Sequence, residues 1–408
     1  MSTAPNLALR VLLPFAAGYF LSYLYRTVNA VLAPEITRSI ALDAADLGLM
    51  TGAYFLAFAA AQPALGILLD RYGPRRIEAG LLLFAAAGAL AFSWAGAAPT
   101  LIAGRALVGF GVAACLMAAL KANVQWFPPD RLALVNGIVL SAGGLGAVAA
   151  TAPVQAALAV TDWRGVYALL AVLTVASAAW LFLAVPERRD GHLGLSLADQ
   201  LREVGAIVRS PLFLRVAPAT MLSMGGFMAV QGLWAGPWLR DVAGLSSGGA
   251  AAGLTVMAAA MAAGFLLMGV IAERLGRLGV PTIRVAAAGM AVSWLASLAM
   301  ALGVDEAPLL LAGIYGFFGT AASLNYAVLT QGFPARLAGR VNTSVNLAIF
   351  VAAFAIQWGL GAVIGLWPAD NGHWPAEAHQ MALAIPVALN AAALAWFMAG
   401  ARTSAAKS

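Results

Sequence analysis

The stretch Gly66-Ile67-Leu68-Leu69-Asp70-Arg71-Tyr72-Gly73-Pro74-Arg75-Arg76 is a short charged segment between two long apolar runs. Its charges stand close together, whereas the surrounding runs contain almost none. Gly66 and Gly73 allow backbones to approach closely where the chain reverses. We therefore predict a turn on the cytoplasmic side that joins two membrane helices.

The composition of the chain is far more apolar than that of soluble proteins. Hydrophobic residues make up 62% and charged residues 10% of the sequence, whereas about 25% of residues in soluble domains are charged. Most apolar runs have the length of about 20 residues that a helix needs to cross a hydrocarbon core roughly 30 Å thick. They lack the alternation over roughly ten residues that is typical of a membrane barrel. We expect an all-α polytopic membrane protein.

Hydropathy, with proline, glycine and charge punctuation, predicts twelve transmembrane helices. The first six spans are expected at 10–32, 46–69, 77–97, 99–126, 132–157 and 163–185, and six more at 212–239, 247–272, 281–302, 308–331, 337–366 and 379–400. The stretch between the two sets, 186–211, is rich in charge and is predicted to be a cytoplasmic linker. The expected domains are an N-terminal six-helix bundle (1–185), this linker and a C-terminal six-helix bundle (212–408).

The basic residues are distributed unevenly over this map. With both termini in the cytoplasm, 17 of the 23 lie on the inner side, and Arg38, Arg164 and Arg240 lie on the outer side. Since Lys and Arg collect in cytoplasmic loops, this bias predicts a multi-pass protein of the bacterial inner membrane with cytoplasmic termini. The same bias explains the net charge of +6, so no nucleic-acid partner is expected.

The two halves of the chain repeat short motifs at nearly constant offsets. A weaker form of the charged turn, Gly269 to Arg277, follows the first after 203 residues. Gln125-Trp126-Phe127-Pro128 and Gln331-Gly332-Phe333-Pro334 are 206 residues apart, as are Asn136 and Asn342. Such spacing indicates two six-helix bundles in parallel repeat.

Over its whole length the chain resembles a transporter of the major facilitator superfamily. The turn from Gly66 to Arg76 matches the signature between the second and third helices, Arg105 within Gly104 to Gly111 resembles the fourth-helix signature, and Gly143, Gly144 and Gly146 with Pro153 resemble the fifth-helix one. Tyr23 to Arg26 followed by Ala33 to Ile36 is similar to the opening of the anion:cation symporter branch, and nitrate/nitrite porters are a second similar branch. The resemblance implies the major facilitator fold. That symporter branch commonly has an acidic residue where this chain has Tyr25, so proton coupling through that position is not carried over.

Three basic residues fall inside predicted spans: Arg26, Arg105 and Lys121. All 17 acidic residues are instead expected in loops or at span ends. A charge near the bilayer centre costs about 2.5 to 3.5 kcal/mol on insertion scales. A water-filled cavity that receives an anion would offset this cost, because the substrate supplies the missing negative charge. A small anionic substrate is therefore expected.

Arg26 is the first candidate for the anion site. Tyr19, Tyr23 and Arg26 stand at i, i+4 and i+7 on one helix face. A guanidinium group can bind a carboxylate, phosphate or nitrate through two parallel hydrogen bonds. In the alternative interpretation, the tyrosines belong to the interfacial aromatic belt and Arg26 extends outward.

For the remaining candidates, binding and structural roles both stay open. Arg105 either contacts substrate or bonds to loop carbonyls or the first helix, and Lys121 either contacts substrate near the inner face or extends to the membrane surface. The second half offers uncharged groups on spans seven, ten and eleven: Gln231, Trp234, Tyr315, Asn325, Asn346 and Gln357. Each of these is alternatively an interhelical hydrogen-bonding or packing residue.

The charged turns are expected to act as a gate. Asp70 ends span two on the inner face, where it is expected to lie against a neighbouring helix such as span eleven, whose start carries Arg336 and Arg340. The resemblance implies that such contacts close the inner side in one state. The gating residues are Asp70, Arg71, Arg75 and Arg76, with Glu273 and Arg274 as their counterparts in the second half.

Nothing in the sequence indicates catalysis, a metal or a cofactor. His192, His373 and His379 lie in loops or at a span end without Cys or carboxylate at metal spacing, and no nucleotide-binding loop is present. The single cysteine, Cys115, excludes an intrachain disulfide. We expect a monomer in the lipid bilayer that is not an enzyme.

The function expected from these features is secondary active transport of a small organic or inorganic anion by alternating access. The direction of transport, and whether a proton or a counter-anion moves with the substrate, stay open. One alternative is a proton-driven exporter of drugs or metabolites. Another is a transporter-like receptor that binds solute without moving it, although the linker 186–211 is too short to be an output domain.

Overall fold

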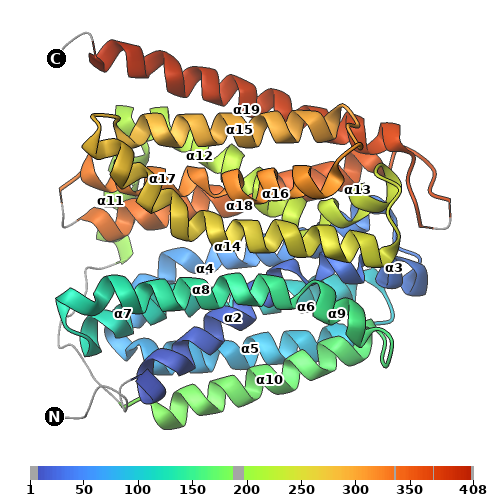
Figure 1. Cartoon of the computed structure of the whole chain (residues 1–408). Coiled ribbons are helices and arrows are strands. Elements are labelled where there is room, and N and C mark those ends of the chain that lie inside the picture. The colour runs from blue at the N-terminus through green and yellow to red at the C-terminus, as the bar shows by residue number, and fades with distance from the viewer. Residues whose placement is uncertain (1–7, 187–196, 335–336, 371, 406–408) are drawn as a thin grey trace. The chain divides into compact units, whose positions relative to one another are not determined.

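The computed structural model describes residues 8–186, 197–334, 337–370 and 372–405 (Figure 1). Within these ranges, twelve helices or runs of joined helices are long and apolar enough to cross a membrane. This confirms the predicted all-α polytopic class, and most span ends lie within a few residues of their predicted positions. Of the predicted linker, residues 187–196 lie outside the described ranges, and α11 (Leu197–Val208) is helical.

By its internal contacts, the chain divides into two compact units, residues 1–40 with 53–197 and residues 41–52 with 198–408. The first unit contains most of α4 (Ala44–Tyr72) and η1 (Ala8–Leu12), α2 (Leu13–Thr27), α3 (Asn29–Ile40), α5 (Pro74–Ser93), α6 (Ala98–Gly111), α7 (Cys115–Trp126), η2 (Pro129–Arg131), α8 (Leu132–Ala149), α9 (Ala152–Ala157) and α10 (Trp163–Ala184). The second contains α11, α12 (Pro211–Ala229), η3 (Val230–Trp234), α13 (Ala235–Asp241), α14 (Ser247–Arg277), α15 (Thr282–Ala301), α16 (Pro308–Gly319), η4 (Ala321–Ser323), α17 (Leu324–Gln331), α18 (Ala338–Ile364) and α19 (Ala376–Ala405). The bundle limits 1–185 and 212–408 stay a prediction.

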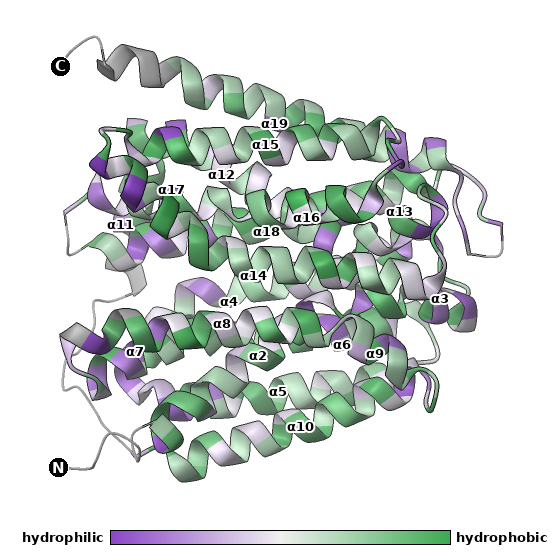
Figure 2. Ribbon diagram, in the orientation of Figure 1, coloured by the Kyte–Doolittle hydropathy of each residue, from purple (hydrophilic) through white to green (hydrophobic). Residues whose placement is uncertain are grey.

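Apolar residues run along the middle of the helices, and hydrophilic residues gather at their ends and in the turns (Figure 2). In the first unit, α5 lies between α6 and α10, and α2 packs on α8. In the second, α14 packs on α16, α12 on α18, and α15 on α19. This distribution is the one expected for helices whose central parts lie in hydrocarbon.

The charged turn has the predicted geometry. Helix α4 ends at Tyr72 and α5 begins at Pro74, whose fixed φ and missing N–H suit the first turn of a helix. Between them, Gly73 adopts φ 80°, in the left-handed region that favours glycine. Its N–H donates to the carbonyl of Leu69 at 3.1 Å, which closes α4.

The first predicted span, 10–32, is wrong in its C-terminal part. The helix is interrupted at Val28, and α3 continues from Asn29 to Ile40 with Pro34 inside it. The Thr27 hydroxyl donates to the Tyr23 carbonyl at 3.0 Å, a contact that commonly bends helices. A hydropathy profile does not show that the Thr27 hydroxyl competes with backbone N–H groups for the Tyr23 carbonyl group.

Glycines bring neighbouring helices of the first unit into backbone contact. A methyl group on Gly109 in α6 would overlap with the carbonyl oxygen and Cα of Tyr54 in α4, and one on Gly146 in α8 would overlap with the Phe20 carbonyl oxygen in α2. Small residues at such crossings are the usual means of close helix packing in membranes. The contact at Gly109 also holds the Tyr54 side chain next to the site described below.

We expect Gly109→Ala to lower the thermal unfolding midpoint in detergent, because overpacking of this kind costs roughly 1 to 3 kcal/mol. Gly80→Ala in α5 is the matched control, since nothing lies within 4 Å of its new methyl group. An unchanged midpoint for Gly109→Ala would contradict the close crossing of α4 and α6.

Candidate functional site

The candidate site in the first unit is built on one face of α2. The rings of Tyr19 and Tyr23 meet edge to face at 5.2 Å, and the Arg26 guanidinium carbon lies 4.3 Å from the centre of the Tyr23 ring. These distances confirm the predicted i, i+4, i+7 face. Arg26 is 6% exposed, and both tyrosines are buried as well. The alternative of an interfacial belt with an outward-reaching arginine is therefore wrong for these side chains.

Helix α4 adds two aromatic side chains to this face. The Phe58 ring centre lies 5.7 Å from the Arg26 guanidinium carbon. Tyr54 is fully buried, donates from its hydroxyl to the Ser22 carbonyl at 3.1 Å, and interacts electrostatically with Arg26. The sequence analysis missed Tyr54, because an apolar span with one tyrosine carries no signal of what it faces.

A second guanidinium lies next to Tyr54. The Arg105 guanidinium carbon is 5.1 Å from the Tyr54 ring centre, and the residue has no exposed surface. Its Nη1 donates to the Tyr25 carbonyl at 2.8 Å and to the Tyr167 hydroxyl at 3.2 Å. Of the two roles left open for Arg105, these bonds support the structural one, in which it binds the first helix. Its Nε and Nη2 have no hydrogen-bond partner among the described residues.

The two partners of Arg105 are themselves held by further polar contacts, and all four residues involved lie outside the predicted set: Tyr25, Tyr167, Asn29 and Thr174. The Tyr167 hydroxyl donates to Oδ1 of Asn29 at 2.6 Å, which joins α10 to the start of α3. The Tyr25 hydroxyl lies 2.9 Å from the Thr174 hydroxyl, also on α10. The Arg105 guanidinium is thus held in a fixed position by α2 and α10.

Lys121 is not an uncompensated cation. Its Nζ forms an ion pair with Asp70 in the first unit, and both side chains are partly exposed. Neither predicted role for Lys121 anticipated this partner. The pair connects the end of α4, next to the charged turn, to α7. Helical periodicity on one span cannot predict it, since the partners are 51 residues apart.

Glu78, which the sequence places at the start of the third span, is buried in the structure. This residue lies in the second turn of α5 and has no exposed surface. Its sequence position near a predicted span end concealed its burial, because α5 begins three residues earlier than expected and the neighbouring helices cover the side chain there.

The uncharged candidates of the second unit fall into separate groups. Trp234 donates from Nε1 to the Gln357 carbonyl at 2.9 Å, and Gln231 in the same π-helical segment contacts Met261. Asn325 donates to Thr220 at 2.8 Å, and Tyr326 donates to Asn346 at 3.1 Å. Tyr315 lines a cavity of about 20 Å³ with Ser223, Ser293, Ser297 and Asn390.

These contacts match the alternative of interhelical hydrogen bonds for Asn325 and Asn346. The cavity at Tyr315 has room for about one water molecule, which excludes a larger ligand in this conformation. Gln357 differs from the others, since its buried amide nitrogen and oxygen have no hydrogen-bond partner within the described part of the chain. It is the uncharged candidate best able to bind a ligand.

The remaining gating candidates lie where charged turns were predicted. Glu273 pairs with Arg277 at 2.5 Å across one turn of α14, and both side chains are exposed. In the first unit, the guanidinium of Arg75 covers the Phe182 ring, and that of Arg71 lies over Tyr72. Arg340 forms an ion pair with Glu203 of α11, whereas Arg336 lies outside the described residues. The contact expected between Asp70 and span eleven stays a prediction.

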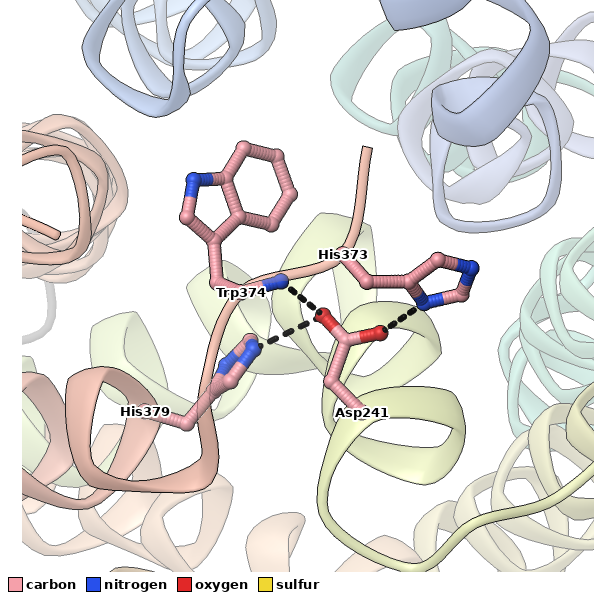
Figure 3. A network of polar contacts seen from close by, with 4 residues as sticks. All are labelled: Asp241, His373, Trp374 and His379. Carbon is pink, nitrogen blue, oxygen red and sulfur yellow. Dashed lines mark hydrogen bonds and ion pairs between the residues drawn. The ribbon is translucent and has the colours of Figure 1, made fainter. Parts of the chain in front are cut away.

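A polar network joins the end of α13 to the start of α19 (Figure 3). The Asp241 side chain is 1% exposed and lies 2.6 Å from Nδ1 of His373 and 3.0 Å from Nε2 of His379. The Trp374 N–H donates to the same carboxylate at 3.3 Å. The sequence analysis found no carboxylate near these histidines, because Asp241 precedes them by more than 130 residues.

Within the described ranges, no group of three or more His, Cys, Asp or Glu side chains is arranged to hold a metal ion. The carboxylate instead fixes the loop before α19 to α13, since a buried charge is stable only with hydrogen-bonding partners. The residues with the chemistry of a binding site thus lie on α2, α4 and α6.

Comparison with known proteins agrees with this description. A sequence profile of the Major Facilitator Superfamily matches residues 15–357. The probable sulfoacetate transporter SauU of Cupriavidus necator is 26% identical over 187 residues, which cover 46% of this chain and 43% of that protein. The hexuronate transporter of Escherichia coli is 29% identical over 222 residues, covering 53% of this chain and 49% of that protein.

The matched region thus covers a little under half the length of each of these two curated relatives. Among solved structures, a bacterial homologue of the human lysosomal transporter Spinster, in an inward-facing and occupied conformation, superposes with a TM-score of 0.80 at 20% identity over 98% of both chains. At this identity the likeness establishes the fold alone.

Proposed function

Because the chain belongs to the major facilitator superfamily, we propose that it is a secondary transporter that moves a small anion across the membrane by alternating access. Two of its relatives are named as transporters of sulfoacetate and hexuronate, which are organic anions with a carboxylate group. A small organic anion of this kind is the cargo we favour. The bias of basic residues supports cytoplasmic termini in a bacterial inner membrane.

The observation that carries this proposal is the pair of buried guanidinium groups that both interact with Tyr54. Arg26 and Arg105 both interact with this tyrosine in the interior of one unit. Two positive charges in surroundings of low dielectric create a potential that favours an anion. A guanidinium also offers the planar fork that fits a carboxylate.

The alternative functions have weaker support. A proton-driven exporter of lipophilic drugs would gain no binding energy from two buried cations, which repel cationic drugs and do not attract neutral ones. A receptor that does not transport solute would need neither the repeated bundles nor the charged turns. Transport of an anion uses all of these features.

The test of the proposed site replaces Arg26. We expect Arg26→Ala to raise the substrate concentration that gives half-maximal uptake by about 30-fold or more, because truncating a buried charge partner costs 2 to 5 kcal/mol. The measurement is uptake of radiolabelled glucuronate or sulfoacetate into proteoliposomes. Arg26→Lys keeps the charge but loses the planar fork of the guanidinium. Its half-saturation concentration should lie between those of the wild type and Arg26→Ala. Arg131→Lys, at an exposed arginine of the same unit, is the control. Uptake by Arg26→Ala equal to that of the wild type would refute the site.

The ion pair of Asp70 and Lys121 supports a gating role for the charged turn. It holds the end of α4 to α7 in this conformation, and a state in which the turn moves must break it. Arg71, Arg75, Arg76, Glu273 and Arg274 are the further residues of this proposal. We place none of them in the anion site.

We expect Asp70→Asn and Lys121→Gln to reduce the maximal uptake rate to a similar extent while ligand binding changes little, because each variant removes the same pair. Glu306→Gln, at an exposed carboxylate outside both charged turns, is the matched control. Loss of ligand binding in a normally folded Asp70→Asn protein, or unequal effects of the two variants, would contradict the gating role.

A further inference from the structure

Helix α5 carries a carboxyl group that the anion site does not use. Glu78 is 0% exposed, and neither of its carboxyl oxygens has a hydrogen-bond partner of ordinary geometry among the described residues. A carboxylate ion placed there would lose its hydration without compensation. Burial of this kind therefore favours the acid that carries a proton.

Three helices form the niche around this carboxyl group. Helix α2 contributes Gly18, where an added methyl group would overlap with Oε1 of Glu78. Helix α7 contributes Cys115, whose sulfur lies 3.8 Å from the position of that methyl group and whose thiol interacts with the carboxyl group. Both residues are buried. In this conformation, the carboxyl group occupies the space that a side chain at residue 18 would need.

We propose that Glu78 is a proton-binding site of this transporter, and that its proton is bound and released together with the anion at Arg26. This inference rests on the proposed anion transport. The ligand is a single proton, taken from water when the niche opens and returned to water when it opens on the other side. It requires no other reactant.

Apart from Arg26 on α2, the charged groups on the helices around α5 are engaged elsewhere. Lys121 on α7 pairs with Asp70, and Arg105 on α6 bonds to Tyr25 and Tyr167. On α10, Arg164 donates to the Ala95 carbonyl, and the Phe182 ring is covered by Arg75 from α5 itself. Arg76 on α5 is also not without an interaction partner. Cys115 is the titratable group that acts on Glu78 directly.

Cys115 also connects the proton site with the anion site. Its thiol interacts electrostatically with both Glu78 and Arg26. The positive charge of Arg26 disfavours a proton nearby, and an anion bound to Arg26 cancels that charge. The anion therefore strengthens proton binding at Glu78, and by reciprocity the proton strengthens anion binding. Coupling of this sign moves the proton and the anion in the same direction.

The first experiment measures the proton directly, without transport. Infrared titration of the purified full-length protein should show a carbonyl band of a protonated acid that Glu78→Gln lacks and that Glu78→Asp and the exposed control Glu306→Gln keep. Adding glucuronate should shift the titration of this band to higher pH. A spectrum of Glu78→Gln that is identical to the wild type, at an unchanged unfolding midpoint, would overturn the proposal.

The second experiment measures coupling in proteoliposomes. A difference of one pH unit should drive about tenfold accumulation of glucuronate for one coupled proton, because a tenfold ratio corresponds to about 1.4 kcal/mol. Glu78→Gln should lose this accumulation and retain exchange of internal for external glucuronate. Accumulation by Glu78→Gln equal to the wild type would overturn the coupling. Absence of both exchange and glucuronate binding in the wild type would instead count against the proposed anion transport, and the infrared band would still decide whether Glu78 binds a proton.

Discussion

The cost of placing a charged group among apolar helices is the constraint on which this structure depends. The buried and partly buried ionisable groups offset this cost in different ways. Lys121 is neutralised by Asp70, Asp241 is surrounded by two histidines and a backbone N–H, and Arg105 bonds to a carbonyl and a hydroxyl. Among the described residues, neither carboxyl oxygen of Glu78 has a hydrogen-bond partner of ordinary geometry, and the group is best accommodated as the acid. Arg26 lies among aromatic rings, with its guanidinium carbon 4.3 Å from the centre of the Tyr23 ring and 5.7 Å from that of Phe58.

This distribution gives the two units different characters. The first unit holds two buried guanidinium groups, a buried carboxyl group and the tyrosines between them. The predicted binding candidates of the second unit are neutral, and most of them are used in bonds between helices, such as those of Asn325 and Asn346. Discrimination of the substrate by charge would then come from the first unit. In the second unit, Gln357 is the candidate whose buried amide group has no hydrogen-bond partner among the described residues.

The sequence predicts those features that depend on local pattern. Twelve apolar runs, the turn at Gly73 and the face of Tyr19, Tyr23 and Arg26 follow from hydropathy, glycine and helical periodicity, and the structure confirms each. Contacts between distant segments do not follow from such patterns. Tyr54 beside Arg26, Glu78 beside Gly18, and Asp241 beside His379 depend on which helix faces meet, which one sequence does not specify. These contacts are also where the functional proposals lie, because they place polar groups in apolar surroundings.

The central claim is that the buried guanidinium groups select an anion, and the thermal stability of the purified protein tests it most directly. A ligand that binds the folded state raises the unfolding midpoint by mass action. Glucuronate and glucose differ in one carboxylate, so the pair isolates the contribution of charge. The account predicts that glucuronate raises the midpoint and that glucose, at the same concentration and ionic strength, does not. An equal rise with both sugars, or no rise with glucuronate, sulfoacetate, phosphate or nitrate, would contradict it.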